Sequence, residues 1–290
     1  MRKLKPDELC WCGSEKMYRD CHSEFDKKIE FYKKKHAKVP SRDMIKTPEQ
    51  VAMIRKAAEV NIAVLDYVAE HIRVGMTTQE IDDMVYQETT KRGAVPAPLN
   101  YNGFPKSVCT SINEVVCHGI PSSKRVLEDG DIINVDCTTV LDGYYADSSR
   151  MFEMGDVSEE KRKLVRVARE CVELGLERVK PWGFLGDIAD AVSKHAQANG
   201  FTVVPDIGGH GVGIDFHEEP FVSYVIRKGT GMLLAPGVMF TIEPMINMGT
   251  QFTNTSYKDG WTVTTRDGQP SAQWEIQVLV TEDGYEVISY

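Results

Sequence analysis

Two periodicities of apolar and polar positions run along this chain, and together they predict an α+β fold. From Ile54 to Ile72, apolar residues recur every three or four positions, which is the spacing of one face of a helix. Thr47-Pro48-Glu49-Gln50 supplies an N-cap, a proline suited to the first helical turn and a capping box. Gly75-Met76 ends this helix, and a second capping box, Thr77 to Glu80, predicts another helix to about Arg92.

The same order of elements recurs in the second half of the chain. Ser158 can cap a helix to about Lys180, Pro181-Trp182-Gly183 interrupts it, and a shorter helix is expected from Asp187 to Asn199. Strands are predicted at Ser107–Cys117, 131–150, Phe201–Val204, Val238–Pro244, Trp261–Thr265 and Ala272–Thr281. Two helices followed by strands, given twice, predict two pseudo-symmetric halves with a site in the cleft between them.

The stretch from Asp131 to Arg150 alternates as a β-hairpin around Asp142-Gly143, a dipeptide that favours a two-residue turn. This turn sets Thr138 opposite Asp147, and Asp136 then shares a sheet face with Asp147, roughly 7–8 Å away at the backbone. Two buried carboxylates repel each other and need a cation, and a metal ion would supply it. Two solvated acids on an open sheet face remain the alternative.

Three further residues carry hard metal ligands in strand-like or turn settings. His210 lies among glycines, Glu243 lies in an apolar run that Pro244 ends, and Glu275 shares a strand face with Gln277. Singly, each is more simply explained as a structural or solvated residue. Four carboxylates and one imidazole together match the oxygen-rich set that holds two divalent ions.

Cysteines and a histidine are concentrated near the start, in the pattern Cys10-x-Cys12-x8-Cys21-His22. Three thiolates and an imidazole can close a tetrahedral zinc site. So short a segment buries no core of its own, so the metal would supply much of its folding energy. The spacing resembles the small zinc module called SEC-C. A redox pair and incidental thiols are the alternatives.

Charge and composition divide the chain into a basic head and an acidic body. Residues 1–46 hold 13 Lys and Arg against 8 Asp and Glu, although the whole chain of 290 residues has a net charge of −9. We expect a zinc motif with a tether or short solvated helix over 1–46 and a catalytic domain over 47–290. The acidic body argues against binding of nucleic acid, and the absence of a long apolar run argues against a membrane span. The polar first residues and the unpaired pattern of seven cysteines favour the reducing cytoplasm.

Several runs between Thr47 and the end of the chain resemble type I methionine aminopeptidase, in that family's order. They are Tyr101-Asn102-Gly103-Phe104-Pro105-Lys106-Ser107-Val108-Cys109, Ser111-Ile112-Asn113-Glu114-Val115-Val116-Cys117-His118-Gly119-Ile120-Pro121, 131–136, Ala146-Asp147, Gly209-His210-Gly211, Thr241-Ile242-Glu243-Pro244 and Trp274-Glu275. The resemblance implies the two-fold "pita-bread" fold and a cytoplasmic enzyme that removes the initiator methionine from nascent chains when the second residue is small.

The same resemblance implies roles for individual residues. It makes Asp136, Asp147, His210, Glu243 and Glu275 the ligands of two divalent ions (Co, Mn, Fe, Ni or Zn), with Glu243 also shuttling a proton. It assigns His217 to the reaction intermediate and His118 to the substrate backbone. It places Tyr101, Cys109, Phe216 and Trp261 in the methionine pocket, and Asn113, Val115 and Ser271 around a monovalent cation.

Departures and rival functions limit what the resemblance implies. Pro98 stands where many relatives have a small residue or cysteine, which affects fine substrate preference. A proline-specific peptidase of the same fold shares the ligand pattern, and a non-catalytic binding module would have lost ligands. We expect a monomer, whose head binds the ribosome and whose first 46 residues are dispensable for hydrolysis of a tripeptide.

Overall fold

The computed structural model describes residues 3–290 and confirms an α+β architecture. Its α-helices are α1 (Ser23–Lys34), α2 (Pro48–His71), α3 (Thr78–Lys91), α4 (Glu159–Leu176) and α5 (Leu185–Ala198). Its strands are β1 (Val95–Pro96), β2 (Cys109–Ile112), β3 (Val115–Cys117), β4 (Ile132–Leu141), β5 (Tyr144–Glu153), β6 (Thr202–Val203), β7 (Gly209–Gly211), β8 (Glu218–Val222), β9 (Met239–Ile242), β10 (Ile246–Asn247), β11 (Thr253–Thr255), β12 (Val263–Thr265), β13 (Ser271–Ala272), β14 (Ile276–Val280) and β15 (Tyr285–Ser289).

Both predicted capping boxes form at the starts of α2 and α3. The Thr47 side chain accepts from the Gln50 amide at 3.2 Å, and the Gln50 side chain accepts from the Thr47 amide at 2.9 Å. Thr77 and Glu80 make the equivalent reciprocal bonds ahead of α3. These bonds satisfy backbone donors that have no partner inside the helix, so the capping pattern fixes where both helices begin.

The hairpin of β4 and β5 forms in the predicted register. Leu141 lies opposite Tyr144, Thr138 opposite Asp147, and Asp136 opposite Ser149. Strands β1 and β2 also pair with β4, whereas a second sheet runs in the order β15-β14-β9-β7-β8. The two sheets meet where Ser149 and Glu275 exchange backbone hydrogen bonds of 3.3 and 3.2 Å.

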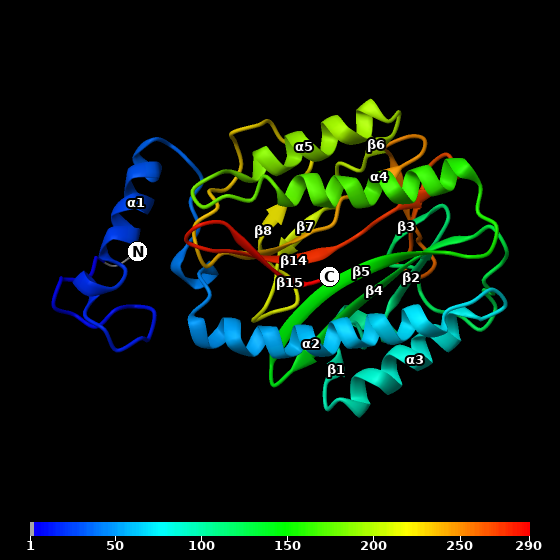
Figure 1. Cartoon of the computed structure of the whole chain (residues 1–290), viewed down its shortest axis with the longest axis horizontal. Coiled ribbons are helices and arrows are strands. Elements are labelled where there is room, and N and C mark those ends of the chain that lie inside the picture. The colour runs from blue at the N-terminus through cyan, green and yellow to red at the C-terminus, as the bar shows by residue number, and fades with distance from the viewer. Residues whose placement is uncertain (1–2) are drawn as a thin grey trace.

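The helices form two layers around these sheets, as Figure 1 shows. Helices α2 and α3 pack with β4 over a core that includes Leu65, Ile81 and Ile133. Helices α4 and α5 pack over a larger core with β9 and β14, to which Leu164 and Ile188 contribute. Each half therefore pairs two helices with a group of strands, as the repeated pattern in the sequence predicts.

Two strand predictions were wrong in detail, and some strands were not predicted. The predicted strand Ser107–Cys117 is two strands, β2 and β3, in different sheets, because the chain turns at Asn113 with a left-handed φ of 51°. Asn tolerates this conformation, and the Asn113 side chain bonds Asp131 and the Ile132 amide across the turn. The segment Ala272–Thr281 is likewise divided into β13 and β14, and the glycine-flanked β7 and proline-containing β8 were not predicted.

The N-terminal segment is packed against the body, so the predicted tether or solvated helix was only partly right. Helix α1 exists, but its Ile29 is 3% exposed and joins the core beneath α4 and α5. The ring of Tyr32 stacks at 6.1 Å on Trp182, which occupies the predicted break between α4 and α5. The Lys28 ammonium lies 4.2 Å from the same Trp182 ring. Apolar and cation–π contacts therefore dock the head.

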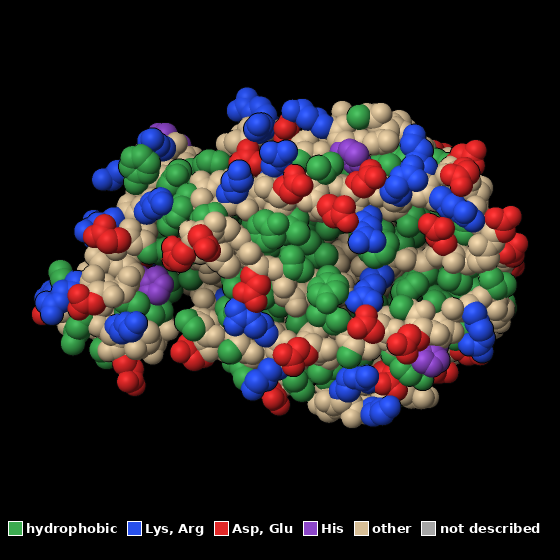
Figure 2. Space-filling view, in the orientation of Figure 1, with side chains coloured by type: hydrophobic (Ala, Val, Ile, Leu, Met, Phe, Trp, Pro, Cys, Tyr) green, Lys and Arg blue, Asp and Glu red, His purple; other side chains and the backbone are tan. Residues whose placement is uncertain are grey.

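The surface around the helices is mixed in charge. Figure 2 shows Lys and Arg side chains interspersed with Asp and Glu over the outer helices, with apolar side chains gathered between the two helical layers. Within residues 3–290, none of the helices has the length and apolar character needed to cross a membrane.

Candidate active site and metal centre

A cavity of about 260 Å³ opens where the two halves meet, and all the predicted catalytic ligands line it. Its walls come from the hairpin β4–β5, from β7 and from the ends of β9 and β13. The lining includes Asp136, Asp147, His210, Glu243 and Glu275, together with Tyr101, Cys109, His118, Phe216, His217 and Trp261. Each half supplies part of this set, so the site exists only when both halves are folded.

The hairpin holds its two acids by backbone register and by hydrogen bonds. Asp147 is 2% exposed, and its Oδ1 accepts from the Thr138 hydroxyl at 2.8 Å. Its backbone amide donates to the Gln277 side chain on β14 at 3.0 Å. Asp136 lies diagonally across the same face. Burial of Asp147 rules out the alternative that both acids are solvated on an open sheet.

His210 points one ring nitrogen at the acids. Its Nε2 lies 3.6 Å from Asp147 Oδ2 and 3.5 Å from Glu243 Oε1, whereas its Nδ1 lies 2.9 Å from the Gly211 carbonyl oxygen. Because the carbonyl only accepts, Nδ1 must carry the ring proton, and Nε2 then presents a lone pair. Burial, and to a smaller extent the nearby His217, lower the pKa of His210 to about 4, so the ring is neutral and suited to bind a metal.

Glu243 and Glu275 complete the set from neighbouring strands of the second half. Glu243 Oε1 accepts from the Thr241 hydroxyl at 2.7 Å, and its Oε2 accepts from the Gln273 amide group at 3.0 Å. Ile242 pairs with Ile276, so each glutamate lies one residue beyond that pair. Glu275 is 2% exposed and lies in the short segment between β13 and β14, directly before β14.

The electrostatics of this cluster require a cation. Burial raises the pKa of Asp136 to about 7 and the pKa of Glu243 to about 8. Burial and the neighbouring carboxylates raise the pKa values of Asp147 and Glu275 well above their usual range. Ligand atoms of Asp147, His210 and Glu275 all lie within 4.8 Å of one another. Oxygen ligands with one neutral imidazole suit divalent transition ions, so the residues fit a metal centre.

Aromatic side chains and two further histidines surround the metal-binding cluster. The Tyr101 ring lies 4.7 Å from Phe216, and the Tyr101 hydroxyl lies 3.0 Å from His217 Nδ1. The His118 ring packs edge-on to Trp261 at 6.0 Å. Burial is the main cause that lowers the pKa of His118, to about 4, and it also lowers the pKa of His217. Both rings are therefore neutral near pH 7.

Several residues of this site were not predicted from the sequence. Asp206, Ile207, Gly208 and Phe221 line the cavity, as do Phe104 and Thr138. Thr241, Gln273 and Tyr224 orient Glu243 from behind, the last by accepting from its backbone amide at 2.7 Å. Alternation along β9 could have indicated Thr241, but Asp206 and Ile207 lie on a loop without a recognisable pattern.

Of the three residues expected around a monovalent cation, Asn113 lies in the turn between β2 and β3, Val115 begins β3, and Ser271 begins β13. The Ser271 amide donates to the Asn113 carbonyl at 2.8 Å, and Val115 pairs with Thr264. The Lys161 ammonium also donates to the Asn113 side chain at 2.9 Å.

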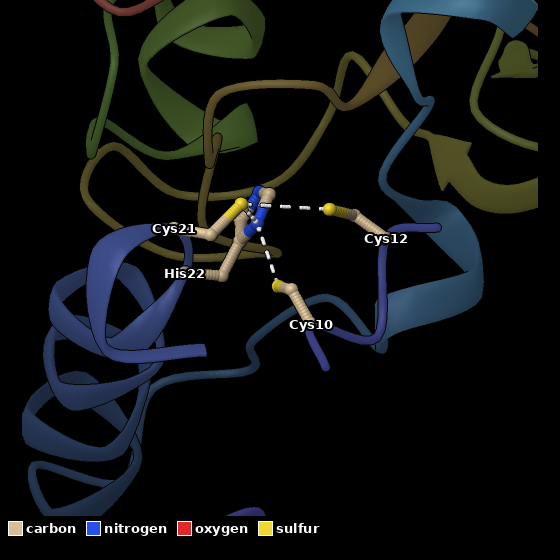
Figure 3. Close-up of side chains that lie close together, drawn as sticks. All are labelled: Cys10, Cys12, Cys21 and His22. Atoms are coloured by element: carbon tan, nitrogen blue, oxygen red, sulfur yellow. Dashed lines mark hydrogen bonds between the residues drawn. The ribbon is translucent and has the colours of Figure 1, made fainter. Parts of the chain in front are cut away.

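A second cluster of metal ligands lies in the N-terminal head. The ligand atoms of Cys10, Cys12, Cys21 and His22 lie within 4.8 Å of one another and converge on one point in Figure 3. His22 Nδ1 is 3.3 Å from Cys10 Sγ and 3.1 Å from Cys21 Sγ, and Sγ of Cys12 and Cys21 are 3.6 Å apart. That separation is far from a bonded disulfide and close to the spacing of thiolates that share a zinc ion.

Comparison with known proteins decides the family. Residues 52–282 match the model of metallopeptidase family M24, and residues 8–24 match the SEC-C motif. The chain belongs to metallopeptidase family M24. Methionine aminopeptidase A of Synechocystis is 50% identical over 83% of this chain and 94% of its own length. Methionine aminopeptidase of Chlamydia pneumoniae is 41% identical over 99% of both chains, which includes the N-terminal head.

Comparison with solved structures shows which members of family M24 this chain is similar to in fold. The crystal structure of methionine aminopeptidase from Rickettsia prowazekii matches with a TM-score of 0.83 at 44% identity, over 85% of this chain and 99% of that one. Prolidase from Pyrococcus furiosus matches 85% of this chain and 65% of that one, with a TM-score of 0.66 at 21% identity, which shows the fold alone. The expected pita-bread fold is confirmed, and the chain belongs with the methionine aminopeptidases of family M24. Membership of this family implies divalent metal ions.

The metal-free M24 enzyme should lose stability as pH rises from 6.5 to 8.5. Across this window the folded carboxyls keep protons that the unfolded chain has lost, because unfolded Asp and Glu titrate near 4. Each such proton lowers the free energy of unfolding by about 1.4 kcal/mol per pH unit. The buried histidines are neutral in the folded state but half protonated at pH 6.5 in the unfolded chain, so they oppose this trend only at the acid end of the window, and by fewer protons than the four carboxyls contribute.

Thermal unfolding of the chelated protein measures this effect. We expect the Tm to fall between pH 6.5 and 8.5, and added Mn²⁺ to raise the Tm more at pH 8.5, where fewer protons compete with the ion for the carboxylates. A chelated protein that becomes more stable over this window would contradict the assigned cluster.

Proposed function

We propose that this protein removes the N-terminal methionine from nascent polypeptides when the second residue is small. The observation that carries this proposal is the position of one apolar slot directly beside the metal-binding cluster. Tyr101, Cys109, Phe216 and Trp261 line the same 260 Å³ cavity as the five ligands, and a small apolar slot suits a thioether side chain. The two curated relatives described above carry the name of this activity.

The five ligands would hold two divalent ions. In this proposal Asp147 and Glu275 would be shared by both ions, Asp136 would serve one of them, and His210 with Glu243 would serve the other. Bound divalent ions supply positive charge that offsets the buried carboxylates and makes a water molecule acidic near neutral pH. Mn, Fe, Co, Ni and Zn all suit this ligand set, so availability in the cell selects among them.

Glu243 moves the proton in this mechanism. Its carboxylate accepts the proton of the attacking water and later passes that proton to the leaving amine. Thr241 and Gln273 hold one carboxylate oxygen each, so the group keeps one orientation during both transfers.

His217 and His118 act on the substrate. With the Tyr101 hydroxyl donating to Nδ1 of His217, the neutral ring carries its proton on Nε2, which can then donate to the oxygen of the tetrahedral intermediate. His118, held edge-on by Trp261, would bond the backbone beyond the scissile bond and crowd a large second side chain.

The remaining expectations concern the other ions and the cellular setting. One structural zinc ion in Cys10, Cys12, Cys21 and His22 would have all four of its positions filled by protein. A monovalent cation near Asn113, Val115 and Ser271 would draw on carbonyl oxygens. We place the enzyme in the cytoplasm as a monomer, with the basic head contacting the ribosome where nascent chains emerge.

Peptide specificity tests the proposed function directly. We expect hydrolysis of Met-Ala-Ser, Met-Gly and Met-Ser peptides after loading with a defined metal, and little hydrolysis of Met-Leu or Met-Lys peptides, because the second side chain must fit beside His118. Comparable turnover of Met-Leu and Met-Ala peptides would contradict the specificity, and preferential cleavage of Xaa-Pro peptides would favour a proline-specific peptidase.

Substitution of the proton carrier should separate chemistry from binding. Glu243→Gln should nearly abolish turnover, because an amide cannot accept the proton, whereas His217→Ala should cost about 10²–10³-fold in kcat, as for loss of one oxyanion donor. Metal content and Tm are measured alongside. A Glu243→Gln protein that holds its metals and turns over at the wild-type rate would show that another group is the base.

The head should bind one zinc ion and serve docking more than catalysis. We expect metal analysis to find a zinc ion that Cys10→Ser/Cys12→Ser removes. A chain that lacks residues 1–44 should hydrolyse tripeptides at nearly the full rate. The deletion ends before Lys46, not after it as the sequence predicted, because the Lys46 side chain is 1% exposed and pairs with Glu218 of the body. Co-sedimentation with ribosomes should be sensitive to salt and lost in both variants. Equal sedimentation of the full-length and shortened proteins would exclude docking through the head.

A further inference from the structure

A buried ion pair ties the start of the catalytic body to the loop that carries His217. Lys46 immediately precedes Thr47, the N-cap of α2. Its side chain is only 1% exposed, which is unusual for a lysine. Its ammonium pairs with the carboxylate of Glu218, whose side chain is 14% exposed. Lysine is rarely buried without a specific partner, because removal of its charge from water is costly.

The two carboxylate oxygens of Glu218 contact different parts of the chain. Oε2 faces Lys46, whereas Oε1 accepts from the backbone amides of Ile214 and Asp215 at 2.7 and 3.0 Å. These two amides begin the turn that presents Phe216 and His217 to the cavity. The carboxylate therefore closes the 213–218 loop on itself and fastens it to Lys46.

Both ends of this clamp are fixed in the body. The Lys46 amide donates to the Gly237 carbonyl at 2.9 Å, just before β9. On the loop side, the Gly213 carbonyl accepts from the Tyr145 amide at 2.9 Å, two residues from Asp147. A Cβ added at Gly213 would lie 3.2 Å from Lys46 Cε and 2.7 Å from Ile54 Cδ1, so the loop packs directly on the lysine stem.

We propose that Lys46 and Glu218 are positioning residues that hold His217 where it meets the oxygen of the reaction intermediate. The proposal rests on the function proposed above and adds to it the means by which an exposed catalytic loop keeps one geometry. His217 is otherwise held by its contact with Tyr101 and by ring packing on Phe216. Since Lys46 is also the last residue of the N-terminal segment, the same pair links the position of that segment to the active site.

The kinetic test uses Lys46→Met, which keeps the length of the stem and removes its charge. We expect kcat for Met-Ala-Ser to fall by roughly 10- to 100-fold, the scale of a misplaced catalytic group, with KM changing much less. Lys46→Arg should recover most of the rate because it restores the charge. Arg55→Met is the matched control. It breaks the ion pair between Arg55 on α2 and Glu286 on β15, away from the cavity, and should leave kcat unchanged.

Two outcomes separate positioning from a general structural effect. In a His217→Ala background, Lys46→Met should have little further effect on kcat, because the group being positioned is gone. An equal fold-loss in both backgrounds would overturn the proposal. Should Lys46→Met fail to fold because it leaves a buried carboxylate unpaired, the double variant Lys46→Met/Glu218→Met removes both charges and supplies the same comparison.

Hydrogen exchange tests the clamp without reference to catalysis. We expect faster exchange of the Ile214 and Asp215 amides in Lys46→Met and Glu218→Gln than in the wild type or Arg55→Met. Unchanged exchange and unchanged kcat in Lys46→Met would overturn the clamp while leaving the proposed function intact. A wild-type protein inactive on Met-Ala-Ser would instead remove the proposed function, and the exchange rates would still decide whether the pair holds the loop.

Discussion

Everything in this structure depends on the cost of burying four carboxylates around one point. Asp147 and Glu275 are each 2% exposed, and desolvation raises the pKa of every acid in the cluster. Without cations these groups must hold protons or repel one another, which is unfavourable for the folded chain near neutral pH. With two divalent ions the same groups become ligands. Metal binding would therefore offset the repulsion among the buried carboxylates, so the stability of the fold and the function of the site depend on the same ions.

The architecture explains how so costly a cluster is assembled. Asp136 and Asp147 come from one half, whereas His210, Glu243 and Glu275 come from the other, and the backbone contact between Ser149 and Glu275 joins the two sheets beside the site. Neutral donors such as Thr138, Thr241 and Gln273 fix the carboxylates without adding charge. The N-terminal head packs on Trp182, in the loop between α4 and α5, and the chain then passes through Lys46 into the body. The cluster of Cys10, Cys12, Cys21 and His22 therefore lies within the same packed structure as the carboxylate cluster.

Local patterns in the sequence predicted those parts of the site that local geometry determines. The Asp142-Gly143 turn and strand alternation placed Asp136 and Asp147 correctly, because hairpin register follows from the turn. The capping motifs likewise located α2 and α3. Glu243 and Glu275 were grouped by residue type and by resemblance, because no spacing rule shows that β9 and β14 are neighbours. The Lys46–Glu218 pair spans 172 residues, and the left-handed turn at Asn113 lacks a glycine or proline, so neither was predicted.

The central claim, that the buried cluster is a two-ion centre built from both halves, is tested most directly by crystallography of the Mn²⁺-loaded protein. Anomalous difference density should show two peaks, about 3.5–4 Å apart, with Asp147 and Glu275 between them and His210 on one side only. A single peak, or two peaks bound by ligands from only one half, would contradict the account.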